Sequence, residues 1–237
     1  RQVLATDGQW RSTQEGPVRA NDLMIGEFQD GRLDMPGWDQ PGFDDSAWAA
    51  AEVVDAPEAL LVAQPNEPIS VIAELSAVAL SEPQPGVHVF DLGQNMVGIA
   101  RLRLRAPAGT QVTLRHAEVL HPDTGMVYTD NLRGSPQIDT YIARGGGEEG
   151  FQPRLTQHGF RYVEVTGLPE VPRVEDLTGV AFNSASPELG ALECSDPMVN
   201  QLWRNILWTQ RANLMSVPTD CPQRDERMGW TGDAQVY

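Results

Sequence analysis

The chain has 237 residues, of which 41% are hydrophobic, so it is long enough for one large domain or two modest ones with packed cores. Its formal net charge of −16 argues against binding to a nucleic-acid backbone or an anionic membrane, and no apolar run approaches the roughly 18 residues of a membrane span. The two cysteines, Cys194 and Cys221, match neither a disulfide framework nor a zinc spacing, which predicts two free thiols and no metal. The chain begins at Arg1 rather than Met, so both a cytoplasmic and a secreted location fit the sequence.

The first part of the chain is rich in Gly, Asp and Trp. Its densest stretch, GRLDMPGWDQPGFDDSAW (31–48), contains two Pro-Gly pairs and is predicted to be a loop. The aromatic residues Trp38, Phe43 and Trp48 form either a sugar-stacking platform or aromatic plugs beneath this loop. Prolines at 57, 65 and 68 then indicate an extended linker.

From about residue 69 the pattern favours β-structure. The stretch ARLRLRAPAGTQVTLRHAEV (100–119) alternates leucine with arginine up to a Pro-Gly turn, and the alternation resumes at Val112 and Leu114. The arginines are expected to be solvated partners of acidic residues, because the chain is acidic as a whole. Further strands are predicted at 87–91, 137–143 and 160–166. Short strands separated by Gly and Pro indicate an antiparallel sandwich.

The hydrophobic period changes near residue 195. Asp196 is suited to cap a helix with Pro197 at its first position, and apolar residues then recur at helical spacing to about Leu214. One amphipathic helix cannot bury its apolar face alone. Either it packs on the sandwich or it begins an all-helical domain that continues beyond Tyr237.

The segment DCPQRDERMGWTGD (220–233) concentrates charge around one tryptophan. Its prolines prevent a regular helix, whereas residues 224–228 could form a single turn, and Asp233 resembles the cap of a further helix. Asp220, Glu226 and Asp233 are therefore expected to converge from a loop. Glycosidic cleavage needs a protonated carboxyl group opposite a carboxylate, but a solvated or metal-binding loop fits the composition as well. The spacing excludes an EF-hand, because proline and arginine occupy ligand positions.

DCPQRDERMGWTGDA closely resembles the signature of bacterial α-L-rhamnosidases of the inverting (α/α)6-barrel type. Other stretches resemble the β-sandwich domains of the same family: GEFQDGRLDMPGW, PGFDDSAW, FDLGQNMVGIARLRLRAPAGTQVTLRHAEVL, YTDNLRG and QHGFRYVEVTG. The resemblance implies a mainly β chain in the order 1–62, the C-terminal part of an N-terminal β-sandwich module; 69–187, a β-sandwich domain; and 190–237, the start of a truncated barrel.

The resemblance also implies roles for five residues. Glu226 takes the place of the general acid. Asp220, Arg224 and Asp233 match residues that hold the rhamnose hydroxyls, and Trp230 matches an aromatic wall of the sugar pocket. Each has a structural alternative: Asp233 a helix cap, Asp220 and Arg224 an ion pair, and Trp230 a core residue.

The implied reaction is hydrolysis of terminal α-L-rhamnosyl residues of a glycoside or polysaccharide with inversion, and it requires no metal or cofactor. The general base of the family lies further along the barrel, so we expect residues 1–237 alone to be inactive. The uncovered barrel helix would then favour self-association. Two alternatives remain open at this point: a non-catalytic carbohydrate-binding β-sandwich, and another inverting (α/α)6 glycosidase.

Overall fold

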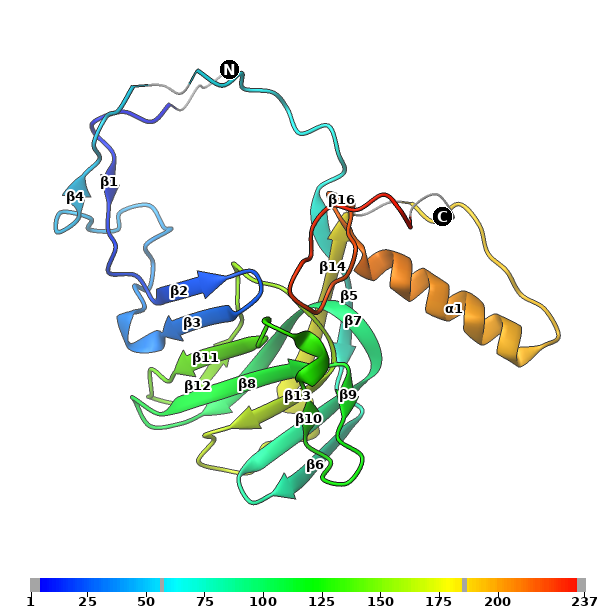
Figure 1. Cartoon of the computed structure of the whole chain (residues 1–237). Coiled ribbons are helices and arrows are strands. Elements are labelled where there is room, and N and C mark those ends of the chain that lie inside the picture. The colour runs from blue at the N-terminus through cyan, green and yellow to red at the C-terminus, as the bar shows by residue number, and fades with distance from the viewer. Residues whose placement is uncertain (1–4, 56–57, 185–186, 234–237) are drawn as a thin grey trace.

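The computed structural model describes residues 5–55, 58–184 and 187–233. The described chain is mainly β, as the sequence predicts (Figure 1). Its main sheet has the strand order β2 (Val18–Asp22), β3 (Gly26–Asp30), β11 (Ile138–Ile142), β8 (Gln111–Ala117), β13 (His158–Thr166), β7 (Val87–Arg105), β14 (Leu177–Ser184) and β5 (Ile69–Ser76). Two further strands, β6 (Ala79–Gln84) and β12 (Glu148–Phe151), also pair with β7.

The long strand β7 connects the two layers of the sandwich. Its first part pairs with β6 and β13, and its second part pairs with β14 and β12. The change of partner falls at Gly98, where an added Cβ would lie 1.9 Å from the Val180 carbonyl oxygen. Only glycine allows the strands to approach so closely there, which explains why the strand can bend at this position.

The alternating residues of the predicted strands fill the core of the sandwich. Large side chains from β7, β8, β12 and β13 are almost fully buried in it, including Phe90, Leu102, Leu114, Phe151 and Phe160. The arginines on the opposite face pair with acids, as expected: Arg101 with Glu74 at 2.7 Å, Arg103 with Asp176 at 3.6 Å and Arg105 with Glu148 at 3.3 Å.

The N-terminal residues are joined to this sheet. Strands β2 and β3 form a hairpin, and β3 then pairs with β11 in parallel, the one parallel pairing among the described strands. Two residues of β1 (Arg11–Ser12) pair with β4 (Ala49–Ala50). The sequence pattern did not predict this junction. The proposed division at residues 62 and 69 stays a prediction, and residues 58–68 carry no regular secondary structure.

The aromatic residues of the 31–48 loop are placed differently from one another. A short 3-10 helix, Gly31–Leu33, starts the loop. Phe43 and Trp48 pack together with ring centroids 5.6 Å apart, whereas Trp38 is 56% exposed. Phe43 and Trp48 are thus partly buried against each other, whereas the Trp38 ring is accessible to a ligand.

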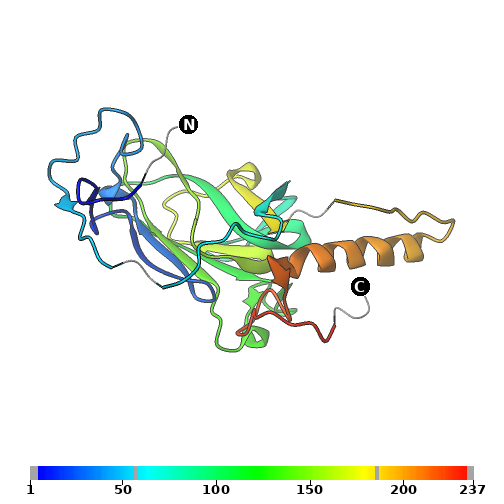
Figure 2. The same ribbon diagram turned by 90° about the horizontal axis from the view of Figure 1, so that it is seen from above.

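The predicted helix is present as α1 (Pro197–Ala212), and the Asp196 side chain accepts a hydrogen bond from the Met198 N–H at 2.8 Å. Trp208 packs against the sandwich core, but the helix extends away from the sandwich (Figure 2). Leu202 and Ile206 are 57% and 45% exposed, so the described residues leave part of the apolar face of the helix uncovered. No described helix is long and apolar enough to span a membrane.

The remaining described elements are short. They are the pair β9 (Val119–Leu120) and β10 (Val127–Tyr128), the pair β15 (Leu214–Met215) and β16 (Val217–Pro218), and the 3-10 helices Asp130–Leu132 and Val174–Asp176. The β15–β16 pair directly follows α1 and leads into the acidic segment.

Candidate active site

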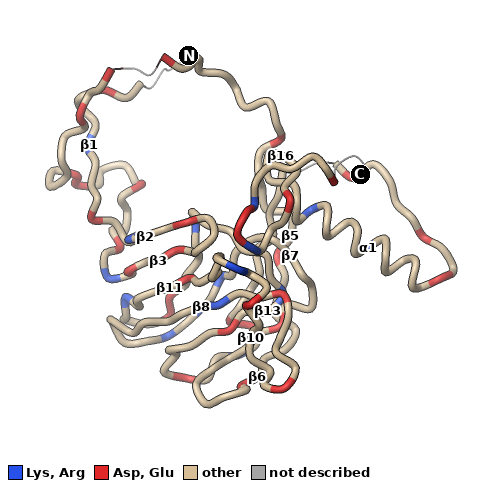
Figure 3. The backbone as a smooth tube through the Cα atoms, in the orientation of Figure 1, with Lys and Arg blue, Asp and Glu red and all other residues tan. Residues whose placement is uncertain are grey.

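The acidic segment is a loop closed at its base by backbone pairing. Thr219 and Gly229 form a β-bridge, the Asp220 N–H donates to the Met228 carbonyl at 3.1 Å, and the Trp230 N–H donates to the Pro218 carbonyl at 2.9 Å. The expected helical turn at residues 224–228 is wrong, because residues 224–225 form a bend and residues 226–228 have no regular secondary structure. The closed base gives the loop a defined position between α1 and the sandwich (Figures 1 and 3).

Asp220, Arg224 and Glu226 lie together in this loop. The Arg224 guanidinium contacts both carboxylates, with Nη2 3.6 Å from Asp220 Oδ2 and Nη1 against Glu226 Oε2. The alternative of an Asp220–Arg224 ion pair is therefore present in the structure, and it also draws Glu226 to the same point. The Glu226 side chain is half exposed, so its carboxylate is open to a ligand.

A second arginine reaches Glu226 from the sandwich. Arg133 Nη1 lies 3.8 Å from Glu226 Oε2 and 3.8 Å from Asp225 Oδ1. Arg133 has φ 56°, a left-handed conformation that is uncommon outside glycine. No sequence pattern indicates a role for Arg133, because its side chain meets the loop only through the tertiary fold.

Asp220 is the most enclosed of the site carboxylates. Its Oδ1 accepts a hydrogen bond from the Met228 N–H at 3.0 Å, and its Oδ2 lies 3.2 Å from the Cys221 sulfur. Both cysteines are free, as predicted, and burial raises the pKa of the Cys221 thiol. Asp220 lines a cavity of about 420 Å³ between the loop, α1 and the sandwich, together with Trp208.

Trp230 and Asp233 lie at the outer end of the loop. Trp230 is 55% exposed, which contradicts its alternative placement in the core, and its indole packs so closely over Gly232 that a Cβ there would lie 2.7 Å from Nε1. Asp233 is exposed in a turn and, within the described residues, makes no ion pair with Arg224. The expected convergence is present for Asp220 and Glu226, which meet at Arg224, and it stays a prediction for Asp233. The helix that it was expected to cap lies outside the described residues.

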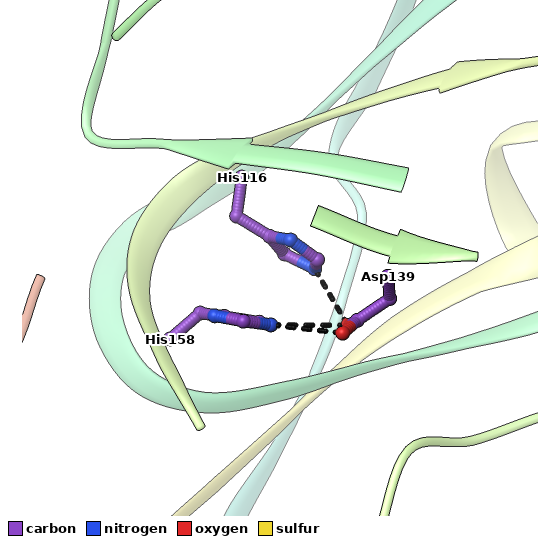
Figure 4. A group of neighbouring side chains, drawn as sticks. All are labelled: His116, Asp139 and His158. Atoms are coloured by element: carbon purple, nitrogen blue, oxygen red, sulfur yellow. Dashed lines mark hydrogen bonds and ion pairs between the residues drawn. The ribbon is translucent and has the colours of Figure 1, made fainter. Parts of the chain in front are cut away.

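Two histidines and one aspartate form a buried cluster (Figure 4), and Arg227 of the acidic loop is close enough to lower the pKa of both histidines. His158 Nε2 is 3.1 Å from both carboxylate oxygens of Asp139, and His116 Nε2 is 3.7 Å from Asp139 Oδ2. Burial is the main reason that the pKa of each histidine is lowered to about 3, and burial also raises the pKa of Asp139. Both imidazoles are therefore neutral at pH 7.

Among the described residues, two groups of side chains have donor atoms close enough for a metal ion. They are His116 with Asp139 and His158, and Asp220 with Cys221 and Glu226. The first group lies near the cationic Arg227, which contributes to lowering the pKa of both histidines. The second group already holds the guanidinium of Arg224. Positive charge at both places disfavours a further cation.

Three successive parts of the chain match models of known domains. Residues 1–73 match the alpha-L-rhamnosidase N-terminal domain, and residues 81–183 match the bacterial alpha-L-rhamnosidase concanavalin-like domain. Residues 187–237 match the bacterial alpha-L-rhamnosidase 6 hairpin glycosidase domain. The loop with Glu226 falls in the third match, and Arg133 falls in the second.

The chain is also similar to curated and solved proteins over almost its whole length. It is 51% identical to an alpha-L-rhamnosidase of Streptomyces avermitilis over 96% of the chain and 22% of the relative. A crystal structure of Streptomyces avermitilis alpha-L-rhamnosidase complexed with L-rhamnose is 51% identical and matches with TM-score 0.93, covering 98% of this chain and 22% of that one. The alpha-L-rhamnosidase of Dictyoglumus thermophilum is 40% identical and matches with the same TM-score, covering 98% and 26%. The chain thus spans about a quarter of the length of these proteins.

Proposed function

The chain belongs to the bacterial α-L-rhamnosidase family, and we propose that it forms the N-terminal part of an enzyme that hydrolyses terminal α-L-rhamnosyl residues with inversion. The observation that carries this proposal is the match of three family domains in sequence order, with the half-exposed Glu226 in the glycosidase domain. A relative with 51% identity has been crystallised with L-rhamnose, which supports rhamnose as the sugar.

Glu226 is proposed as the general acid. In an inverting enzyme one carboxylic acid protonates the departing glycosidic oxygen while a carboxylate roughly 6.5–9.5 Å away activates water on the opposite face of the sugar. Glu226 is suited to the first role because its carboxylate is accessible and its loop is closed by backbone pairing. No carboxylate of residues 1–237 is assigned the role of the base, so we expect this chain alone to be inactive.

The two arginines beside Glu226 suggest how its protonation depends on the substrate. The guanidinium groups of Arg224 and Arg133 lie next to the Glu226 carboxylate, whereas an acid catalyst must hold a proton. We infer that the sugar hydroxyls draw Arg224 away from Glu226. The carboxyl group can then take up the proton that it later donates to the leaving oxygen.

The other four residues are proposed to bind the sugar. Asp220 and Arg224 provide an acceptor and a donor for vicinal hydroxyls, and Trp230 presents an exposed indole for an apolar face of rhamnose. Asp233 makes no ion pair with Arg224 within the described residues. Its contact with a sugar hydroxyl is proposed from its match to the family signature.

The test compares substrates that differ in their need for acid catalysis. In the full-length protein, Glu226→Gln should lose most activity on rhamnosides with poor leaving groups and much less on nitrophenyl rhamnosides, because nitrophenolate leaves without protonation. Glu170→Gln, an exposed site outside the loop, serves as the matched control and should behave like wild type.

Nuclear magnetic resonance of the first-formed rhamnose reports the stereochemistry. A wild-type protein that fails to cleave any rhamnoside contradicts the proposed activity. Equal losses on both substrate types would remove Glu226 from the acid role. Saturable sugar binding without turnover would instead favour the non-catalytic carbohydrate-binding alternative.

A further inference from the structure

Arg227, the residue next to the proposed acid, points in the opposite direction from it. Its side chain is buried, with only 6% of the residue exposed, whereas the Glu226 side chain is half exposed. Arg227 has φ 53°, in the left-handed region that residues other than glycine rarely adopt. This backbone conformation persists only if the surroundings hold it in place. The contacts of the guanidinium are the evident source of that restraint.

The guanidinium is held by acceptors from three segments far away in the sequence. Nη1 donates to the Leu23 carbonyl in the β2–β3 loop and to the Gln157 carbonyl just before β13. Nη2 donates to Ser135 Oγ at 2.7 Å and to Gln137 Oε1 at 3.1 Å, both just before β11. We call these four groups the Arg227 socket. Leu23 lies within the part that matches the N-terminal domain, and the other three lie within the concanavalin-like match.

The same guanidinium also braces the acid loop from within. Its Nε donates to the Arg224 carbonyl at 3.1 Å, and Nη2 donates to the Gln223 carbonyl at 3.0 Å. One side chain therefore connects the backbone of residues 223 and 224, just before Glu226, to the two β domains. Burial lowers the pKa of Arg227 to about 10, so the group keeps its charge at neutral pH. If any acceptor moves, the charged guanidinium keeps an N–H without a hydrogen-bond partner. This costs free energy, because water cannot replace the acceptor inside the protein.

The socket is itself rigid. Ser135 Oγ donates to the Met24 carbonyl at 2.7 Å, and the Gln137 side-chain amide bonds to the backbone of Gly159 in both directions. The loop also packs tightly on β13: a Cβ on Gly159 would lie 2.8 Å from Gln223 Cβ and 3.1 Å from Gln223 Cα. The acid loop is thus seated on the sandwich both by hydrogen bonds and by close packing.

We propose that Arg227 is a positioning residue that fixes the Glu226 carboxylate, and that the N-terminal and concanavalin-like domains supply its socket. The β domains would then be part of the catalytic apparatus rather than separate binding modules. This inference rests on the proposed role of Glu226 as the acid. In this proposal Arg227 does not contact the sugar, but it determines the position of the Glu226 carboxyl group that donates the proton.

The experiment uses the full-length protein with Arg227→Ala and Arg227→Lys. Displacement of the acid should lower kcat/KM on rhamnosides with poor leaving groups by about 10²-fold, since misplacement of about 1 Å has this effect. Nitrophenyl rhamnosides should lose far less, and the inhibition constant of free rhamnose should stay near the wild-type value. Guanidinium ions should restore part of the Arg227→Ala activity on the poor leaving groups. Arg105→Ala, which removes an exposed arginine with one acidic partner, is the control.

A second pair of variants guards against loss of folding at Arg227. Gly159→Ala should push the loop off β13 and give the same leaving-group dependence with Arg227 intact. Gly150→Ala on the adjoining part of the sandwich, where a Cβ would meet no heavy atom within 4 Å, should be silent. Circular dichroism and thermal melting report whether each variant folds.

The outcomes separate the two proposals. If wild type cleaves rhamnosides while the Arg227 and Gly159 variants match it, or lose activity equally on both substrate types, the positioning role is wrong and the proposed function stands. If wild type cleaves no rhamnoside, the proposed function itself fails. The positioning role is supported if the variants lose activity mainly on poor leaving groups and guanidinium ions restore it. A loss of folded protein would instead lower the rates on all substrates alike.

Discussion

The buried histidine pair predicts that this chain is destabilised by mild acid. His116 and His158 have no exposed surface, and burial lowers the pKa of each to about 3 from the ordinary 6.5. Between these values the unfolded chain binds a proton on each imidazole and the folded chain does not. The free energy of unfolding therefore falls as the pH is lowered through this window.

The size of the loss follows from the same values. At pH 5 each histidine removes about 2 kcal/mol of unfolding free energy relative to neutral pH, or about 4 kcal/mol for the pair. Asp139 acts in the opposite direction: burial raises its pKa, so the folded carboxyl group binds a proton at a higher pH than the unfolded one and offsets part of the loss. The unfolding free energy therefore falls most steeply with pH between pH 6.5 and the pH at which Asp139 takes up its proton, and less steeply below that pH.

Urea unfolding followed by tryptophan fluorescence at pH 7.5 and pH 5 measures this difference. His158→Gln should be less stable at pH 7.5, because its imidazole contacts Asp139, but it should lose less on going to pH 5. The matched control is His121→Gln, at a partly exposed histidine outside the cluster, which should keep the full wild-type loss. Equal wild-type stability at both pH values, or an unchanged loss in His158→Gln, would refute the reasoning.

Three further predictions concern the site and the sheet. In the full-length protein Arg133→Ala should lower kcat/KM on rhamnosides with poor leaving groups more than on nitrophenyl rhamnosides, because a contact that holds the Glu226 side chain is removed; steady-state kinetics equal to wild type on both substrate types would contradict this. Trp230→Ala should raise KM for aryl rhamnosides on the order of 10-fold, about 1.4 kcal/mol, and steady-state kinetics with an unchanged KM would exclude stacking on the indole. Gly98→Ala should lower the unfolding free energy by about 3 kcal/mol or more, since its Cβ would overlap the Val180 carbonyl, whereas Gly150→Ala should stay near wild type in chemical denaturation.

The elements that the sequence predicts correctly are those with a local cause. The strand at 101–105 follows from the alternation of leucine and arginine, and the helix after Asp196 follows from its cap and Pro197. His116 continues the alternation of Val112 and Leu114, so its inward direction was readable in the pattern. That Asp139 meets it was not, because that contact depends on β11 lying beside β8.

In the candidate site, too, the sequence reveals features with a local cause and misses those that depend on tertiary contacts. The residues of the acidic loop were found through their resemblance to a family signature, and hydrophobic periodicity contributed nothing to them. The expected helical turn at 224–228 failed because Arg227 is drawn into acceptors that lie as many as 204 residues earlier in the chain. Arg133 was missed for the same reason: its contact with Glu226 joins two segments whose proximity only the folded sheet creates.

The order of the Arg227 socket along the chain has a consequence for biosynthesis. Leu23, Ser135, Gln137 and Gln157 all precede Arg227, so a ribosome completes every outer acceptor before it adds the arginine. Domains generally fold as units from the N-terminus during synthesis. The β domains can therefore fold first, and the nascent loop can then adopt its conformation against them as it emerges from the ribosome. In a hybrid protein in which a foreign sandwich precedes this loop, the sandwich would have to place the same four acceptors around Arg227 for the loop to adopt the same conformation.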